Sequence, residues 1–149
     1  MKAVLQRVIK AEVQVGEFVS GSINNGLLVY LGISTNDTDQ EASYLVDKIV
    51  NLRIFEDENG KLNQSLLDTQ GELLIVSQFT LYADCRKGNR PGFTDAAPPD
   101  KAEKLYEVFI NLCKDKNLQV QTGVFRASMQ VSSTNSGPVT IILESKPSN

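Results

Sequence analysis

The alternation of apolar and polar residues at the start of the chain predicts a long first strand and a hairpin. Apolar side chains recur between Val4 and Val15 with a spacing close to two, as in a strand with one buried face. A turn at residues 16–17 leads into a second strand that begins at Phe18. Residues 26–33 are almost wholly apolar, which indicates a strand that is covered on both faces.

Two segments show helical spacing instead. Thr38 and Glu41 form a capping box, and the apolar residues that follow predict an amphipathic helix over residues 38–52. Pro99 and Asp100 are typical of the start of a second helix. One apolar face of this helix is expected to comprise Ala102, Leu105, Phe109 and Leu112.

The rest of the chain is predicted to form strands, a hairpin and one long loop. The hairpin turns at residues 58–60, and a buried strand covers residues 72–81. Residues 82–99 are rich in glycine and proline and form a long loop, which in a compact domain is usually functional or disordered. Two further strands are expected between residues 120 and 131, and a last strand over 139–143.

These elements predict a single α/β domain over residues 1–149, with a mixed sheet that helices cover on one side. A hydrophobic content of 41% and a charged content of 22% are typical of a globular protein. No apolar run reaches the ~20 residues of a membrane span, and no signal peptide is evident, so we expect a cytoplasmic protein without a membrane partner. Residues 146–149 are expected to fray.

The absence of histidine excludes several kinds of catalytic site. Ser-His and Cys-His pairs cannot form, and two cysteines, Cys85 and Cys113, do not suffice for a zinc site. We therefore expect no metal and no cofactor. Catalysis has to use backbone N–H groups, hydroxyls, carboxylates or groups of the substrate. A thiol hydrolase that uses Cys85, beside Arg86 and Lys87, is one alternative.

Two short segments interrupt apolar strands with small polar and backbone-shaping residues. Residues 77–81 read Ser-Gln-Phe-Thr-Leu, and residues 135–140 read Asn-Ser-Gly-Pro-Val-Thr. A Gly-Pro step at the start of a buried strand is unfavourable, because proline removes a ladder donor and glycine loses entropy on folding. With both segments, and a likeness that runs nearly end to end, the chain resembles the D-aminoacyl-tRNA deacylases, homodimeric proofreading enzymes of translation.

The resemblance implies a three-layer α/β/β fold with a barrel-like core. It also implies hydrolysis of the ester of D-aminoacyl-tRNA, which binds by its acceptor end, with active sites at the interface of a homodimer. A cis Gly137–Pro138 step would enter the partner subunit's pocket and exclude L side chains by rigid backbone. Because this exclusion acts at Cα, we expect glycyl-tRNA to be hydrolysed too.

We expect the first segment to carry the reaction. Backbone N–H groups of Phe79 and Thr80 are candidates for an oxyanion hole, with Gln78 beside them. Three roles remain open for Thr80: a nucleophile, a residue that positions the substrate by a hydrogen bond, and an ordinary strand residue. No histidine is present to activate its hydroxyl. The substrate-binding residues that the resemblance implies are Ser77, Ala97, Phe125, Met129, Gly137 and Pro138, although Phe125 and Met129 could equally be strand core.

The net charge of −3 argues against a general affinity for nucleic acid, so a tRNA has to meet a local basic patch. Arg86, Lys87 and Arg90 are the candidates, and a merely solvated loop is the alternative. A non-catalytic nucleic-acid-binding module would need this loop but not the Gly-Pro step. The chain departs from the common family pattern at Arg126, where glycine is usual, and at Ser128 and Ser136.

Overall fold

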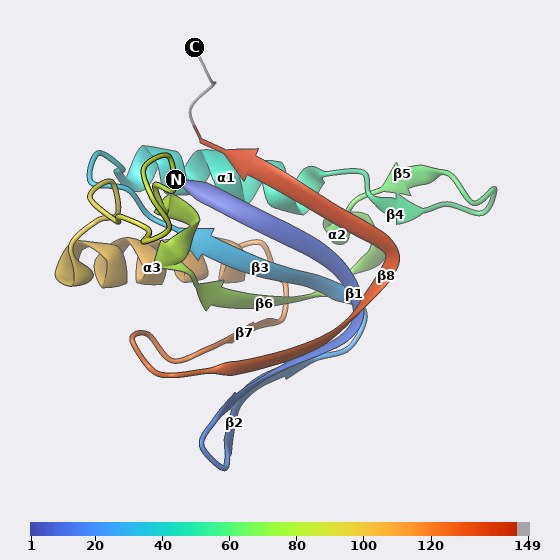
Figure 1. Cartoon of the computed structure of the whole chain (residues 1–149). Helices are drawn as coiled ribbons and strands as arrows, with labels where there is room; N and C mark the ends of the chain where they lie inside the picture. The colour runs from blue at the N-terminus through green and yellow to red at the C-terminus, as the bar shows by residue number, and fades with distance from the viewer. Residues whose placement is uncertain (146–149) are drawn as a thin grey trace.

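The computed structural model describes residues 1–145 and shows a strongly curved, barrel-like mixed sheet with its two long helices on one face (Figure 1). The expected tail at 146–149 lies outside the described residues. The elements follow in the order β1 (Lys2–Val15), β2 (Phe18–Ile23), β3 (Gly26–Gly32), α1 (Asp39–Asn51), β4 (Phe55–Glu56), β5 (Leu62–Gln64), α2 (Leu66–Thr69), β6 (Glu72–Ser77), the 3-10 helix η1 (Phe79–Tyr82), α3 (Pro99–Lys114), β7 (Val120–Thr122) and β8 (Gln130–Glu144). None of the helices within residues 1–145 is long and apolar enough to cross a membrane.

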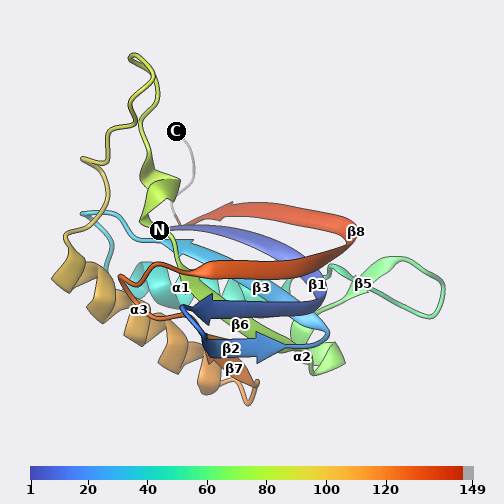
Figure 2. The same ribbon diagram turned by 60° about the horizontal axis from the view of Figure 1, so that its bottom comes forward.

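Strand β1 organises the sheet because it pairs along both of its edges. One edge pairs with β8 over almost its whole length, and the other pairs first with β3 and then with β2, all antiparallel. β3, β6 and β7 continue the sheet as parallel neighbours. The full order is β2-β1-β3-β6-β7 with β8 beside β1, and its curvature is visible in Figure 2.

Two apolar clusters lie on opposite faces of the sheet. Leu31 and Ile75 belong to the cluster that packs against α1 and α3, where Phe109 is fully buried. Leu28 and Leu74 belong to the second cluster, inside the curve of the sheet. β3 is therefore buried on both faces, as its apolar run predicted. The class and the barrel-like, layered architecture that the resemblance implied are confirmed.

Both predicted helices form, with Thr38 as the N-cap of α1 and its capping box intact. Several strand boundaries differ from the prediction. The strand expected over 72–81 ends at Ser77, and the chain then turns into η1. Of the two strands expected between residues 120 and 131, the first forms as β7. The second begins only at Gln130 and is continuous with the strand expected over 139–143, as β8, because pairing with β1 holds the polar residues 132–135 extended.

β8 carries a wide bulge where it crosses the middle of β1. Gln6 pairs with Thr140 and Val8 with Asn135, so Arg7 alone faces residues 136–139. The Gly137–Pro138 peptide bond within this bulge is cis.

The Arg7 side chain holds the bulge from inside. Only 9% of Arg7 is exposed. Its Nε donates to the Ser136 carbonyl at 3.2 Å, and its Nη1 donates to the Ile54 carbonyl at 3.0 Å. Its Nη2 also lies 3.7 Å from a carboxylate oxygen of the exposed Glu56. Arg7 thus ties residues 136–139 to the start of the β4–β5 hairpin.

Arg7→Ala should lower the free energy of unfolding by about 2–3 kcal/mol, because two partly or fully buried carbonyls lose their donors. The melting temperature should fall by roughly 5–10 °C. Lys10→Ala, at an exposed position on the same strand, should shift it by less than about 2 °C. Equal shifts for the two variants, measured by calorimetry, would show that Arg7 does not secure the bulge.

Candidate functional site

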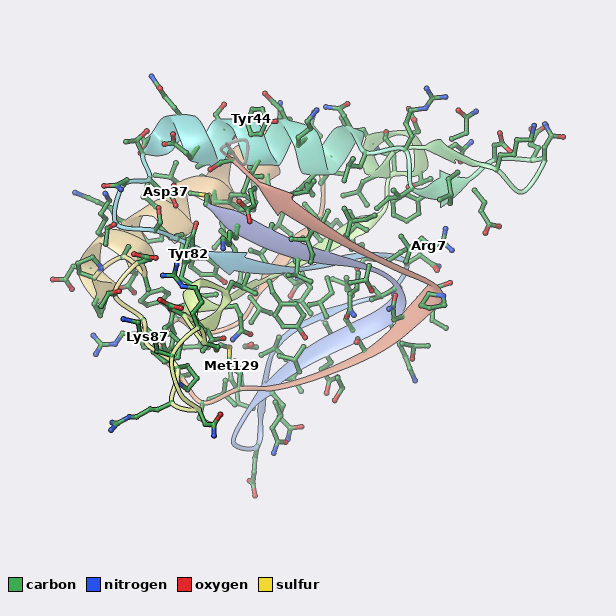
Figure 3. All side chains as sticks on the ribbon, turned by 45° about the horizontal axis from the view of Figure 1, so that its top comes forward. Arg7, Asp37, Tyr44, Tyr82, Lys87 and Met129 are labelled. Atoms are coloured by element: carbon green, nitrogen blue, oxygen red, sulfur yellow. The ribbon has the colours of Figure 1, made fainter. Side chains whose placement is uncertain are left out.

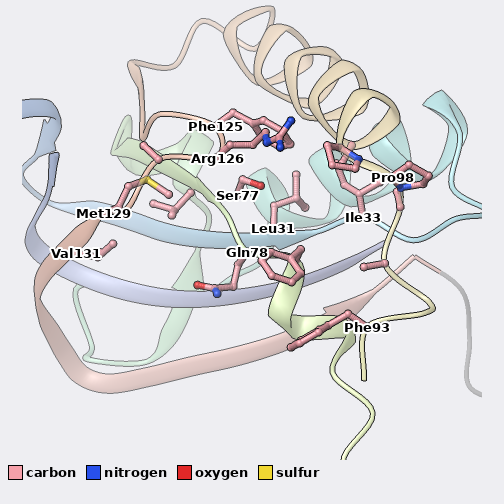
Figure 4. Close-up of a pocket in the computed structure, with 17 residues that line it drawn as sticks. Leu31, Ile33, Ser77, Gln78, Phe93, Pro98, Phe125, Arg126, Met129 and Val131 are labelled. Carbon is pink, nitrogen blue, oxygen red and sulfur yellow. The ribbon is translucent and has the colours of Figure 1, made fainter. Parts of the chain in front are cut away.

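A cavity of about 680 Å³ opens where β6 ends (Figure 4). Its walls come from the ends of β3 and β6, the start of η1 and the segment that leads into α3. The β7–β8 loop and the start of β8 complete them. The lining residues are Leu31, Ile33, Val76, Ser77, Gln78, Phe79, Phe93, Ala96, Ala97, Pro98, Pro99, Ala102, Phe125, Arg126, Ala127, Met129 and Val131. Nearly all of them are apolar or neutral, so the cavity suits a mostly uncharged group.

The floor of the cavity forms where β6 leaves the sheet. The Gln78 N–H makes a last bond to the Leu31 carbonyl at 2.8 Å, and η1 then begins at Phe79. A Cβ at Gly32 would lie 3.1 Å from the Gln78 carbonyl oxygen, so glycine lets this turn pack closely on β3. The first N–H groups of a helix have no partner within it. Within residues 1–145, those of Phe79 and Thr80 also find no acceptor elsewhere.

One wall is the segment before α3, which is anchored to the end of β3. The Ala97 N–H donates to the Ile33 carbonyl at 2.9 Å, and the Thr35 N–H donates to the Asp95 carbonyl at 3.1 Å. Phe93 meets Phe79 edge to face, with ring centroids 5.0 Å apart. Phe93 was not predicted from the sequence, although a large apolar residue within a Gly- and Pro-rich loop is a signal that could have found it.

The opposite wall is held by the buried side of α3. Phe125 packs against Tyr106, with ring centroids 5.9 Å apart, and the Tyr106 hydroxyl donates to the Ile75 carbonyl at 2.7 Å. Burial raises the pKa of Tyr106 above its ordinary value, so this hydroxyl stays a donor. A Cβ at Gly123 would lie 2.6 Å from the Met129 Sδ, so glycine there leaves room for Met129 at the cavity.

The structure brings most of the predicted substrate residues together. Ser77, Gln78, Phe79, Ala97, Phe125 and Met129 all line the cavity. Thr80 does not, because its side chain is exposed and its hydroxyl accepts a hydrogen bond from the Gln78 amide. This position is a consequence of the early end of β6, which the sequence pattern did not reveal.

Gly137 and Pro138 also lie outside this cavity. Both are exposed in the β8 bulge. Figure 3 places Arg7, which holds the bulge, and Met129, which lines the cavity, at well-separated parts of the molecule. Within one chain, therefore, the second predicted segment does not reach the first.

The three predicted tRNA-binding cations lie on a loop that projects from the body of the molecule (Figure 2). Reciprocal backbone bonds between Asp84 and Gly92 close the base of this loop. Arg86 is engaged locally, because its guanidinium donates to both carboxylate oxygens of Asp84, at 2.9 and 2.8 Å. These bonds hold the pKa of Asp84 at about 2. Lys87 and Arg90 are exposed and lie outside the cavity.

Charge within the cavity wall comes from a single residue. Arg126 is the one ionisable side chain among the lining residues, and sequence reasoning noted it only as a departure from a family pattern. Across residues 1–145, no group of three or more His, Cys, Asp or Glu side chains is placed to hold a metal ion. The chemistry available here is that of backbone donors, an amide, a serine hydroxyl and one guanidinium.

A family model described as D-Tyr-tRNA(Tyr) deacylase matches residues 4–144. The D-aminoacyl-tRNA deacylase of Thermosipho africanus is 61% identical over 98% of this chain and 98% of its own. That of Clostridioides difficile is 57% identical over 99% of both chains.

Two solved structures share the fold. A c-Myc DNA unwinding element binding protein superposes with a TM-score of 0.92 at 47% identity, over 99% of this chain and 100% of its own. A probable eukaryotic D-amino acid tRNA deacylase superposes with a TM-score of 0.84 over 96% of this chain and 98% of its own. At 18% identity, the latter likeness concerns the fold alone.

The two cysteines should differ sharply in reactivity. Cys85 is exposed, whereas Cys113 is buried on α3, where burial raises the pKa of its thiol to about 12. A thiol reagent should therefore modify one cysteine in the native protein and the second only after unfolding, as counted by mass spectrometry. Blocking Cys85 should leave ester hydrolysis within about twofold of the untreated protein, since Cys85 does not line the cavity. Complete inactivation would instead support a thiol hydrolase.

Proposed function

Because the chain belongs to the D-Tyr-tRNA(Tyr) deacylase family, we propose that it hydrolyses the ester bond of D-aminoacyl-tRNA. The products are a free D-amino acid and intact tRNA, and the reaction takes place in the cytoplasm. The observation that carries the proposal is the largely uncharged cavity at the end of β6, bordered by a turn in which the N–H groups of Phe79 and Thr80 have no acceptor within residues 1–145.

An aminoacyl ester is already activated, so the protein does not need a strong nucleophile. It has to position water, or the neighbouring ribose hydroxyl, and stabilise the oxyanion that forms on the carbonyl oxygen. Oriented N–H donors contribute on the order of 10²–10³ in rate each. The N–H groups of Phe79 and Thr80 are the proposed donors, and the Gln78 side chain borders the same site. No histidine is required by this route.

Chirality is proposed to be sensed by main chain rather than by a side-chain pocket. Gly137 and Pro138 are exposed and outside their own cavity, so they are free to enter the cavity of a second copy. Their backbone would then occupy the space that an L side chain needs, whereas a D isomer presents hydrogen there. This arrangement requires a homodimer with its active sites at the interface.

The acceptor end of the tRNA would pass Lys87 and Arg90 on the projecting loop, with Arg86 as a third contact once its bond to Asp84 opens.

The decisive assay compares D-tyrosyl-, L-tyrosyl- and glycyl-tRNA with purified protein, by release of the labelled amino acid. We expect the D ester to be cleaved more than about 200-fold faster than the L ester, beyond what a pocket contact worth ~1–3 kcal/mol supplies. Glycyl-tRNA should be cleaved as well, because it has no side chain to exclude. Similar rates for both enantiomers would refute the deacylase proposal, and complete sparing of glycyl-tRNA would refute exclusion by backbone alone.

Thr80→Val should retain more than a tenth of the wild-type kcat/KM on D-tyrosyl-tRNA, because the exposed hydroxyl of Thr80 bonds Gln78 and has no base to activate it. Thr69→Val, which alters an exposed threonine on α2, provides the control for the loss of a hydroxyl. Single-turnover rates of the two variants on D-tyrosyl-tRNA test whether the Thr80 hydroxyl is required for hydrolysis. Total loss of hydrolysis by Thr80→Val alone would contradict this expectation and support Thr80 as the nucleophile.

A second candidate function is nucleic-acid binding without catalysis. The relative described as a DNA unwinding element binding protein, 47% identical to this chain, favours it. The net charge of −3 and a sequence pI near 5.0 disfavour it, since duplex binding draws most of its affinity from phosphate contacts. The assay with D- and L-tyrosyl-tRNA separates the two, because a binding module would hydrolyse neither.

A further inference from the structure

The backbone at Arg126 adopts a conformation that arginine rarely takes. The Ala127 N–H donates to the Val124 carbonyl at 3.2 Å, which closes a four-residue turn, and Arg126 occupies its third position with a φ of +66°. A positive φ at this position is typical of a type II turn and favours glycine. A residue whose backbone is held in a strained conformation beside a cavity is a reason to look for a functional contact.

The charge of Arg126 is uncompensated at this site. No carboxylate in residues 1–145 pairs with it, and all other residues that line the cavity are neutral. Two other arginines differ in this respect, because Arg86 is paired with Asp84 and Arg7 is bonded to backbone carbonyls. In Figure 4 the Arg126 side chain lies beside Phe125 at the cavity, and it remains exposed to solvent. A free guanidinium in such a place binds oxyanions, with two donors where the geometry allows.

This inference rests on the proposed function, in which the substrate is an aminoacyl-tRNA. The structure of that substrate shows which anion could meet Arg126. In an aminoacyl ester the α-carboxyl group is consumed, and the α-amino group is neutral or positive, so neither attracts a guanidinium. The anion next to the ester is the phosphate on the 5′ side of the terminal ribose. We propose that Arg126 binds this phosphate and thereby positions the 3′-terminal nucleotide, with the aminoacyl group directed towards Gln78 and Phe79. An acidic D side chain is a second source of an oxyanion, but the exposed position of Arg126 favours the nucleotide backbone.

Two small substrates that differ by one phosphate test this assignment. They are the D-tyrosyl 2′(3′)-esters of adenosine 5′-monophosphate and of adenosine. Arg126→Gln should lower kcat/KM about 5–10-fold on the phosphate-bearing ester and less than about twofold on the adenosine ester. Arg126→Lys should retain most of the activity on both. Lys61→Gln, which removes an exposed charge from the β4–β5 hairpin, should change neither.

Full-length tRNA gives a second, independent measurement. The slope of log kcat/KM against log salt concentration for D-tyrosyl-tRNA should be shallower by about 0.7 in Arg126→Gln, the value for one phosphate contact on a single strand. Arg126→Gly and Arg126→Asn should show the same change in slope. Both should melt at or above the wild-type temperature, because glycine and asparagine adopt a positive φ more readily. A lower activity is then not a result of unfolding.

Equal losses of Arg126→Gln on the two adenosine esters, or an unchanged salt slope, would overturn the assignment. A loss confined to D-aspartyl-tRNA relative to D-tyrosyl-tRNA would also overturn it and assign Arg126 to the amino acid side chain. If the wild-type protein cleaves only full-length D-tyrosyl-tRNA, the salt slope decides alone. If it cleaves no D-aminoacyl ester at all, the proposed function itself fails, and the role of Arg126 in it fails too.

Discussion

β1 pairs along both of its edges, and this double pairing fixes where the other strands lie. One edge aligns β3 and, through it, β6, whose end at Ser77 forms the floor of the cavity. The other edge pairs with β8 along almost its whole length, with two irregularities, one where Arg7 alone faces residues 136–139 and one between Val8 and Lys10. β1 therefore positions both segments, 77–81 from one of its edges and 135–140 from the other. Backbone hydrogen bonds set the pairing, and the Arg7 side chain secures the bulge in the second segment.

The cavity relies on backbone for its chemistry because the chain offers few alternatives. With no histidine in the sequence and Cys85 outside the cavity, the groups that face a ligand are the main chain, one side-chain amide, a serine hydroxyl and the Arg126 guanidinium. The proposed main-chain donors directly follow a strand that is buried on both faces, and this closely packed strand fixes where the turn begins. Such donors suit an activated ester, whose hydrolysis requires stabilisation of charge more than activation of a nucleophile.

The floor and the rim of the site differ in burial. The floor is formed by β3 and β6, which are buried on both faces, and Tyr106 ties α3 to the Ile75 carbonyl beneath it. The rim carries exposed aromatic side chains, with Phe79 at 55% and Phe93 at 37% exposure, and the unpaired Arg126. Exposed apolar groups beside one cation are a reasonable surface for a nucleotide, which presents a base to stack on and a phosphate to pair with.

The amino-acid pattern alone was enough to predict the periodic elements, the α/β class and the family, together with six of the residues that line the cavity. These follow from local patterns: the capping box at Thr38, the apolar run at 26–33 and the intact segments at 77–81 and 135–140. The end of β6 at Ser77, the continuity of β8 through polar residues and the position of Thr80 outside the cavity became known only from the folded chain. Strand ends, bulges and exposure depend on hydrogen bonds to partners that are distant in the sequence, such as β1. Pairing of this kind produces no periodic pattern of apolar residues, so the sequence alone does not reveal it.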